Sequence, residues 1–579
     1  MWDTALDWLA RREWDEGAPL LVVGAIIGVA GGLGAVAFYK LIDLANLLLV
    51  QLPAARAGIL DAGVYRALLT AAGVWLAWFI VRRTRVPDGQ NVPDVQLAVA
   101  KRGGVMPFRP VLVRTLASAV TLGSGASAGS EGPVAVLGAA TGALLGRMLR
   151  FQTRHRKILV GCGAAAGIAG AFNAPFAGAF FALEEILGSF SVGAFSPVVI
   201  ASVVGALVVR PLMGAHPAFP VPPATDAHPM ANAALYPVLG IACGLVSAVF
   251  ARMYLAAPRA LRAIPGPEWL IPLVAGGIVG TITALSGDLL AGNGHLAIPS
   301  VVFGQLAWYL LIALALAKIL ATVVTLGGGG SGGVFTPTLF IGAALGGGVG
   351  RAMQDIIPGH VVHPEAWALV GMAGMIAGAT RAPLTAIFMV FELTDDYSYI
   401  IPLMIVAVVA YGTARRWSPH GLYDGWLAGR GEHLAHGADR ALMEQIHVRD
   451  ALSDGIVSIP PEARIGEIVE IAARSRQAAF PVVDEAGSLV GVITRNELHD
   501  AMAQGSSLAG LLVAADLAES MEPMSPSQSL RVALAAMNAR SRDALPVIER
   551  GAGGEPVFRG IITRADVLAA YERALEEYV

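Results

Sequence analysis

One carboxylate, Glu131, lies in a glycine-rich stretch between two long apolar segments. The stretch reads GSGASAGSEGP and runs from Gly123 to Pro133. Proline is favoured in the first turn of a helix, so a helix is predicted to begin near residue 131. A helix start offers free backbone N–H groups and the positive end of the helix dipole, which together bind anions. Glu131 is therefore a candidate gate and proton carrier that competes with an anion, and the alternative is that it only caps the helix.

Composition places most of the chain in a membrane. Of the 579 residues, 55% are hydrophobic and only 14% are charged, whereas soluble domains carry roughly 25% charged residues. Residues 19–428 hold the apolar character, and residues 437–579 have the mixed composition of soluble domains. A net charge of −3 without a polybasic run argues against nucleic acid as a partner. Cys162 and Cys243 lie in apolar segments and indicate neither a disulfide framework nor a metal centre.

The membrane part is an internal duplication with halves at about 19–214 and 235–430. Two pairs of stretches align without gaps: 127–147 with 331–351, and 169–185 with 377–393. Hydrophobic segments broken by glycine and proline at matching positions of two halves point to a transport site near the middle of the membrane. Glu131 lies in such a break, and its counterpart in the second half is Phe335.

Other apolar segments are long enough to cross a bilayer, which takes about 20 residues. These are 19–50, 61–81, 235–257 and 306–326. Residues 1–18 predict an amphipathic helix at the cytoplasmic surface. Arg11 and Arg12 precede the first span and Arg415 and Arg416 follow the last, so the positive-inside rule places both ends in the cytoplasm.

The soluble tail also repeats itself. Residues 478–498 are similar to residues 543–567, and each stretch predicts two short strands followed by a helix that opens with TRNE or TRAD. The pattern is typical of a paired βαββα module.

Over about residues 19–428 the pattern resembles the CLC chloride channels and transporters. GSEGP (129–133) is similar to the glutamate-gate motif of that family, GGVFTP (332–337) to its second anion-site motif and GQNVPDV (89–95) to its first. The tail resembles tandem CBS domains, at about 440–502 and 510–575. The resemblance implies an all-α polytopic membrane protein with an inverted internal repeat, plus an α/β cytoplasmic CBS pair, in the cell (inner) membrane.

The resemblance also implies roles for single residues. Glu131 would be the external gating glutamate and Glu185 the internal proton glutamate. The anion-binding residues would be Gln90, Val334, Phe335 and Tyr423. For Tyr423 the alternative is an interfacial aromatic, and for Glu185 it is a solvated helix end. Glu184 and its repeat mate Glu392 are expected to be structural, as acceptors of backbone hydrogen bonds.

Three positions depart from the family pattern. Gln90 stands where many members have serine, Asn91 replaces a glycine, and Ser130 replaces the usual Arg or Lys before the gating glutamate. The loss of that positive charge should weaken long-range attraction of anions. Pro133 and Tyr423 favour the chloride-type branch over fluoride exporters.

The expected function is coupled exchange of chloride for protons by a homodimer with one pathway in each subunit. The alternative is a passive anion channel of the same fold. No cofactor is required, although the resemblance allows an adenine nucleotide at Thr563 and Asp566 of the CBS pair. An intramembrane hydrolase is disfavoured, because the sequence has no HExxH motif. A purely regulatory nucleotide sensor would not need a duplicated membrane part.

Overall fold

The computed structural model divides into two compact units, Met1–Leu434 and Ala435–Val579, and each is described by itself. Residues 1–17 of the predicted amphipathic helix and Gln90 lie outside the described residues. The structure describes residues 18–52, 62–86, 91–214, 232–357, 363–432, 438–452, 456–475, 477, 479–485, 487–495, 497–498, 512–539, 542–550 and 556–578.

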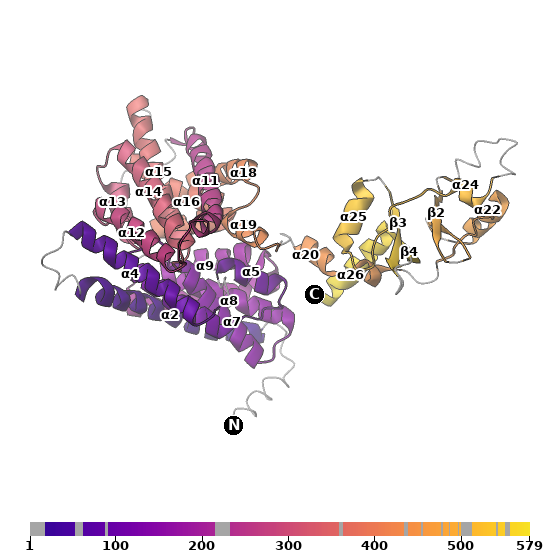
Figure 1. The fold of residues 1–579 in the computed structure, drawn as a ribbon, viewed down its shortest axis with the longest axis horizontal. Helices are drawn as coiled ribbons and strands as arrows, with labels where there is room; N and C mark the ends of the chain where they lie inside the picture. The colour runs from indigo at the N-terminus through magenta and orange to yellow at the C-terminus, as the bar shows by residue number, and fades with distance from the viewer. Residues whose placement is uncertain are drawn as a thin grey trace, which may run out of the picture. The chain divides into compact units, whose positions relative to one another are not determined.

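The described part of the first unit consists of helices and their connections, with the two halves in succession (Figure 1). The helices of the first half are α2 (Ala18–Asn46), α4 (Ala62–Arg83), α5 (Val92–Ala100), α6 (Phe108–Gly123), α7 (Glu131–Met148), α8 (Thr153–Phe172), α9 (Pro175–Phe181) and α10 (Val192–Met213). The helices of the second half are α11 (Tyr236–Arg262), α12 (Leu270–Leu285), α13 (Ile298–Phe303), α14 (Trp308–Gly327), α15 (Phe335–Ile356), α16 (Pro364–Thr380), α17 (Pro383–Thr394), α18 (Ile400–Trp417) and α19 (Leu422–Ala428).

Six helical segments of the described chain are long and apolar enough to cross a membrane. They are Ala18–Gln51, Gly63–Arg83, Val192–Met213, Tyr236–Arg262, Trp308–Gly327 and Tyr397–Ala428. Four of them coincide with the predicted spans. The segments that begin at Val192 and Tyr397 were not predicted as spans. Pro197 and Pro211 lie inside α10, and membrane helices accommodate such prolines because their neighbours satisfy the freed backbone groups.

Equivalent helices pack in the same way in the two halves. In the first half α7 packs against α8, and in the second half α15 packs against α16 (Figure 1). Both contacts are close because glycines face backbone. A Cβ on Gly138 would lie 2.0 Å from the carbonyl oxygen of Gly163, and one on Gly346 would lie 2.1 Å from that of Trp367. Neither site has room for any side chain.

One pair of successive helices in each half is separated by a left-handed residue and a proline. Asn173 ends α8 with φ of 54°, and Pro175 begins α9. Arg381 ends α16 with φ of 72°, and Pro383 begins α17. A break of this kind leaves the first N–H groups of the following helix without partners inside that helix. Acceptors for α9 and α17 must therefore come from elsewhere in the unit.

Glu392 and Glu184 supply those acceptors across the two halves. The carboxylate of Glu392, on α17, accepts the backbone N–H groups of Phe176 (2.9 Å) and Ala177 (2.7 Å) at the start of α9. The carboxylate of Glu184, in the π-helical turn that continues α9, accepts the N–H groups of Leu384 (3.1 Å) and Thr385 (2.7 Å) at the start of α17. The prediction that Glu184 and Glu392 are structural acceptors of backbone hydrogen bonds is confirmed.

The second unit contains two antiparallel strand pairs. Its elements are α20 (Ala438–Gln445), α21 (Val448–Ala451), α22 (Ile465–Arg474), β1 (Ala479–Val483), β2 (Leu489–Thr494), α24 (Ala514–Leu517), α25 (Leu530–Ala539), β3 (Ala544–Arg550), β4 (Pro556–Thr563) and α26 (Arg564–Tyr578). β1 pairs with β2 and β3 pairs with β4, each with one register shift. The predicted leading strand of each repeat is present only as a parallel bridge, Ile459 to Val482 and Met524 to Val547.

The reciprocal caps predict a stability effect. Glu392→Ala should lower the free energy of unfolding of the membrane unit by about 1–3 kcal/mol, because two N–H groups at the start of α9 lose their acceptor. Thermal unfolding of the purified protein in detergent measures the change. Glu268→Ala is the control, since that side chain is 66% exposed and contacts only Arg82 among the ion pairs of the described residues. Equal melting temperatures for the two variants would contradict the capping role.

Candidate functional site

The starts of α7 and α15, one from each half, meet inside the first unit. Gly129 and Gly333 form an isolated antiparallel bridge in which each N–H donates to the carbonyl of the other at 2.7 Å. The two backbones touch so closely that a Cβ on Gly333 would lie 2.9 Å from the nitrogen of Gly132. The two glycine-rich breaks therefore hold two helix starts side by side, with their free N–H groups and positive dipole ends together.

The carboxylate of Glu131 lies on the start of the opposite helix. Its side chain is buried, with 1% of the residue exposed. Oε2 accepts the backbone N–H of Thr336 at 3.2 Å, and Oε1 accepts the hydroxyl of Ser130 at 2.6 Å. Thr336 is in the first turn of α15. Glu131 thus supplies a negative charge to a helix start in the other half, at a place where a free anion would also bind.

The other predicted anion residues of this region are buried around the same point. Val334 precedes α15 and is 3% exposed, and Phe335 is 2% exposed. The Phe335 ring contacts two further rings, those of Phe172 and Phe181, with centroids 6.0 and 6.1 Å away. These apolar rings lie beside the start of α15 and lower the local dielectric, which strengthens electrostatic contacts there.

Tyr423, in the first turn of α19, lies in the interior rather than at a lipid interface. It is 6% exposed and belongs to the same buried cluster as Val334 and Phe335. The charges of both Glu131 and Glu185 act on its hydroxyl. Tyr423 is therefore within electrostatic range of both predicted proton-carrying glutamates.

Glu185 lies in the π-helical turn Ala182–Leu187. The side-chain amide of Gln96 donates to both the Glu185 carbonyl (2.8 Å) and its carboxylate (2.9 Å). The carboxylates of Asp424 and Glu184 are also close enough to act on its charge. Glu185 is half-buried and has a fixed partner, unlike a freely solvated helix end. Gln96 was missed, since an amide in an apolar helix gives no specific motif.

The first anion-site motif is described only in part. Gln90 lies outside the described residues, so its prediction stands without a structural account. Asn91 immediately precedes α5, and its N–H donates to the carboxylate of Asp94 at 3.1 Å. Asp94 also forms an ion pair with Arg430 at 3.3 Å, which ties α5 to the residues after α19. Asn91 in this structure starts a helix, and Asp94 holds that start in place.

A cavity of about 900 Å³ leads to Glu131 from the face that carries the end of α2 and the start of α4. Its lining includes Tyr39, Arg66, Glu131, Asn293 and His295. Arg66 brings a positive charge to this lining, and it forms an ion pair with Asp288 at 3.1 Å.

The membrane unit matches a known protein family. The family model described as voltage gated chloride channel matches residues 72–415 of this chain. The chain belongs to that family, the CLC proteins. It is a multi-pass membrane protein with the CLC fold, and the predicted fold class is confirmed.

Individual relatives agree with this assignment. The chain is 32% identical over 416 residues to a ClcB-like chloride channel protein from Ralstonia nicotianae, covering 71% of this chain and 96% of the relative. It is 30% identical over 424 residues to the H(+)/Cl(−) exchange transporter ClcA of Yersinia pestis bv. Antiqua, covering 71% and 87%. A slow cyanobacterial Cl−/H+ antiporter has a similar fold, with a TM-score of 0.62, 24% identity, and coverage of 70% and 96%.

The second unit contains two CBS domains, which match residues 448–504 and 519–573. In each CBS domain the Thr-Arg-x-acid motif closes a capping box at a helix start. The backbone N–H of Thr563 donates to Asp566 at 2.8 Å and its hydroxyl does so at 2.6 Å. The N–H of Thr494 donates to Glu497 at 2.7 Å. These side chains therefore have a structural role that the sequence did not predict.

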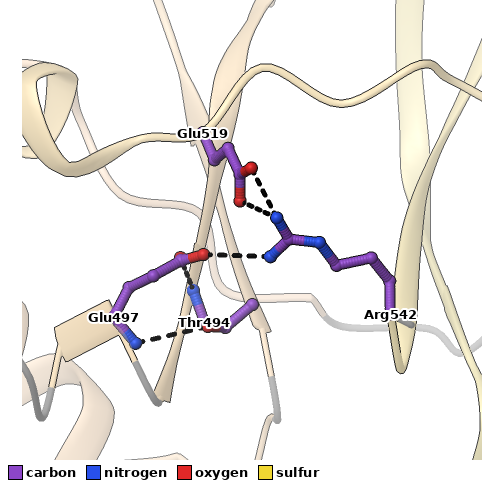
Figure 2. Close-up of polar contacts among 4 residues, drawn as sticks. All are labelled: Thr494, Glu497, Glu519 and Arg542. Atoms are coloured by element: carbon purple, nitrogen blue, oxygen red, sulfur yellow. Dashed lines mark hydrogen bonds and ion pairs between the residues drawn. The ribbon is translucent and has the colours of Figure 1, made fainter. Parts of the chain in front are cut away.

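Arg542 joins the two CBS domains at the first of these motifs. Figure 2 shows its guanidinium between Glu497, at 3.3 Å, and Glu519. The two sheets also meet through small apolar side chains, including Ala479 and Ala544. The acid of the first CBS motif is thus neutralised by an arginine from the second CBS domain.

Among the described residues, no group of three or more His, Cys, Asp or Glu side chains is placed to hold a metal ion.

The contact between the helix starts predicts that Gly333→Ala is destabilising. The added methyl would overlap the backbone of Gly132, and overpacking of this kind costs about 1–3 kcal/mol. Thermal unfolding in detergent should show a lower melting temperature than for Gly277→Ala, whose added methyl meets no atom within 4 Å. A Gly333→Ala variant as stable as Gly277→Ala would mean that the two helix starts are not in contact.

Proposed function

We propose that this CLC protein exchanges chloride for protons across the membrane. The observation that carries the proposal is the carboxylate of Glu131 bound to the N–H of Thr336. A relative 30% identical to this chain is named as an H(+)/Cl(−) exchange transporter, which supports the same activity.

Exchange follows from competition for one electropositive place. Charged Glu131 and a chloride ion both carry the negative charge that the start of α15 favours, so they exclude each other there. Protonation removes the charge of Glu131 and weakens its hold on the N–H group. The side chain then leaves with a proton, and chloride enters. Each exchange thus moves an anion and a proton in opposite directions.

The inner part of the proton path would run from Glu131 toward Glu185. Tyr423 lies within the electrostatic range of both carboxylates and its hydroxyl is suited to contact the central anion. The amides of Val334 and Phe335, and Gln90 of the first motif, are proposed to complete the anion site. Gln96 would keep the carboxylate of Glu185 in place at the inner end.

The orientation proposed for the chain is with both ends in the cytoplasm of a cell whose inner membrane it spans. Arg156 donates to the carbonyl of Gly103 at 2.6 Å, and Lys101 pairs with Glu432 at 2.7 Å. Residues 147–157 contain five basic side chains, at Arg147, Arg150, Arg154, Arg156 and Lys157, and this segment is therefore on the same face as the end of the membrane unit. The positive-inside rule assigns such a face to the cytoplasm.

A homodimer with one pathway in each subunit is also proposed. Glu131, Thr336 and Tyr423 come from a single chain, so one subunit contains a whole pathway.

With both ends of the membrane unit in the cytoplasm, the CBS pair would also be cytoplasmic. Adenine nucleotide binding at Thr563 and Asp566 stays a prediction; since Arg542 already neutralises Glu497, we propose the second motif rather than the first as its site.

Proteoliposomes monitored with a chloride electrode and a pH electrode test the exchange. A chloride gradient should drive protons uphill in the wild-type protein. Glu131→Gln should abolish proton movement because its side chain cannot take up and release a proton. Glu185→Gln should keep chloride flux and lose coupling, and Glu268→Gln, at an exposed position, is the control.

Chloride flux without uphill proton movement in the wild-type protein would contradict the exchange. That result would instead identify a passive chloride channel of the same architecture.

A further inference from the structure

Ser130 is in direct contact with the carboxylate of Glu131, the proposed gate. The residue is fully buried. Its hydroxyl donates to Oε1 of Glu131 at 2.6 Å, a distance typical of a hydrogen bond to a charged oxygen. A hydroxyl has one proton to give, so the remaining neighbours of Ser130 must act as donors to its oxygen.

Asn293 is placed to donate to that oxygen. The side-chain amide nitrogen of Asn293 lies 3.3 Å from it. The hydroxyl of Tyr39 lies at the same distance, but it also donates to the carbonyl of Ala171 at 3.3 Å. The orientation of the Asn293 amide is set from its other side. Its oxygen lies 2.5 Å from Nδ1 of His295 and accepts the backbone N–H of His295 at 3.3 Å. The NH₂ group is therefore turned toward Ser130.

The segment that carries Asn293 is fixed by a buried lysine. The ammonium of Lys318, on α14, donates to the carbonyls of Leu290 and Gly292 at 3.0 Å each. Lys318 is fully buried, in the middle of a membrane-spanning helix. A charge at that depth is costly and usually marks a function. Here it holds the backbone on both sides of residue 291.

The same segment is also tied to the glycine-rich break that precedes Glu131. The N–H of Gly292 donates to the carbonyl of Gly125 at 3.1 Å, and its carbonyl accepts the N–H of Ala128 at 3.3 Å. Residues 290–295 therefore have a fixed position relative to Ser130. A connected series runs from Lys318 through this segment and Ser130 to the carboxylate of Glu131.

We propose that Ser130 and Asn293 form a latch that holds the charged carboxylate of Glu131 against α15. The proposal rests on the proposed role of Glu131 as the gate. Ser130 is a positioning residue, and Asn293 acts through it by fixing its oxygen so that the single proton is given to Glu131. The latch favours the charged, seated carboxylate and thereby sets how acidic the solution must be before the gate opens.

Other charged and titratable groups face this arrangement and stay unchanged in the test. Tyr39 and Tyr423 face Glu131 from α2 and α19. Lys318 and Asp43 face His295 from α14 and α2. Since the latch is a hydrogen bond to the charged form, its removal favours the protonated form. Chloride flux that depends on protonation should then begin at a higher pH.

The experiment measures chloride flux into proteoliposomes of the full-length protein as a function of pH. Ser130→Ala should raise the pH of half-maximal flux by about one unit, because a hydrogen bond to a charged group is worth roughly a tenfold change in proton affinity. Asn293→Ala should shift it in the same direction by less. The double variant should match Ser130→Ala, because Asn293 acts only through the Ser130 hydroxyl.

Ser127→Ala is the matched control. Its hydroxyl is buried in the same break but contacts Thr322 at 2.9 Å. It should leave the midpoint where it is in the wild-type protein. Ser130→Ala in a Glu131→Gln background should likewise leave the pH dependence of that variant unchanged, which shows that the effect passes through the carboxylate.

An unchanged midpoint in Ser130→Ala, with a wild-type protein whose flux depends on pH through Glu131, would overturn the latch. An additive double variant would overturn the role of Asn293. If wild-type flux does not depend on pH, or if Glu131→Gln does not alter that dependence, the proposed function fails instead, so the two failures are separated by the same data.

Discussion

A backbone N–H group at the start of a helix needs an acceptor, and inside a membrane protein bulk water does not supply one. The N–H of Thr336 is in this position, buried at the start of α15. An unpaired polar group in such a place costs several kcal/mol by order of magnitude. The acceptor must therefore be brought by the protein or be a mobile ion. The carboxylate of Glu131 accepts the hydrogen bond from this N–H group and can release it on protonation.

The rest of the membrane unit holds the Thr336 N–H and the Glu131 carboxylate within hydrogen-bond distance of each other. One half supplies the carboxylate and the other supplies the N–H group, so the site exists only where the halves meet. The bridge between Gly129 and Gly333 fixes that meeting point. Glu184 and Glu392 tie the halves together a second time, at the starts of α9 and α17. The two halves have equivalent backbone breaks, but only the first half carries a carboxylate there, because the counterpart of Glu131 is Phe335.

The sequence was sufficient to predict the features that leave a local pattern. Glu131 was recognisable because a carboxylate inside a broken apolar segment is costly unless it functions. The duplication was readable from aligned glycines, prolines and arginines, and it implied that two breaks would be equivalent. The structural role of Glu184 and Glu392 could be predicted since both repeat at the same place after a proline-started helix.

Other parts of the site depend on contacts between distant segments. Thr336, Asn293 and Gln96 are small polar residues without a distinctive spacing, and only the fold brings them to the two glutamates. Arg542 is likewise an ordinary arginine until the two CBS domains pack together. Lys318 did leave a signal, as a lone cation in an apolar span.

Residue 114, at the repeat offset of 204 from Lys318, is also basic. Both residues lie before the aligned stretches 127–147 and 331–351, so the match appears only when the alignment is extended toward the N-terminus. The contacts of Lys318 could not have been predicted from the sequence, because the segment around Leu290 has no counterpart in the aligned stretches.

The central claim is that a carboxylate and a small anion take turns on the start of α15. A structure of the Glu131→Gln variant grown in bromide, with the anion located by its anomalous scattering, tests it most directly. The account predicts bromide within hydrogen-bond reach of the Thr336 N–H, where the carboxylate lies in the present structure. Bromide bound elsewhere in the pathway, with that N–H bonded only to protein, would contradict it.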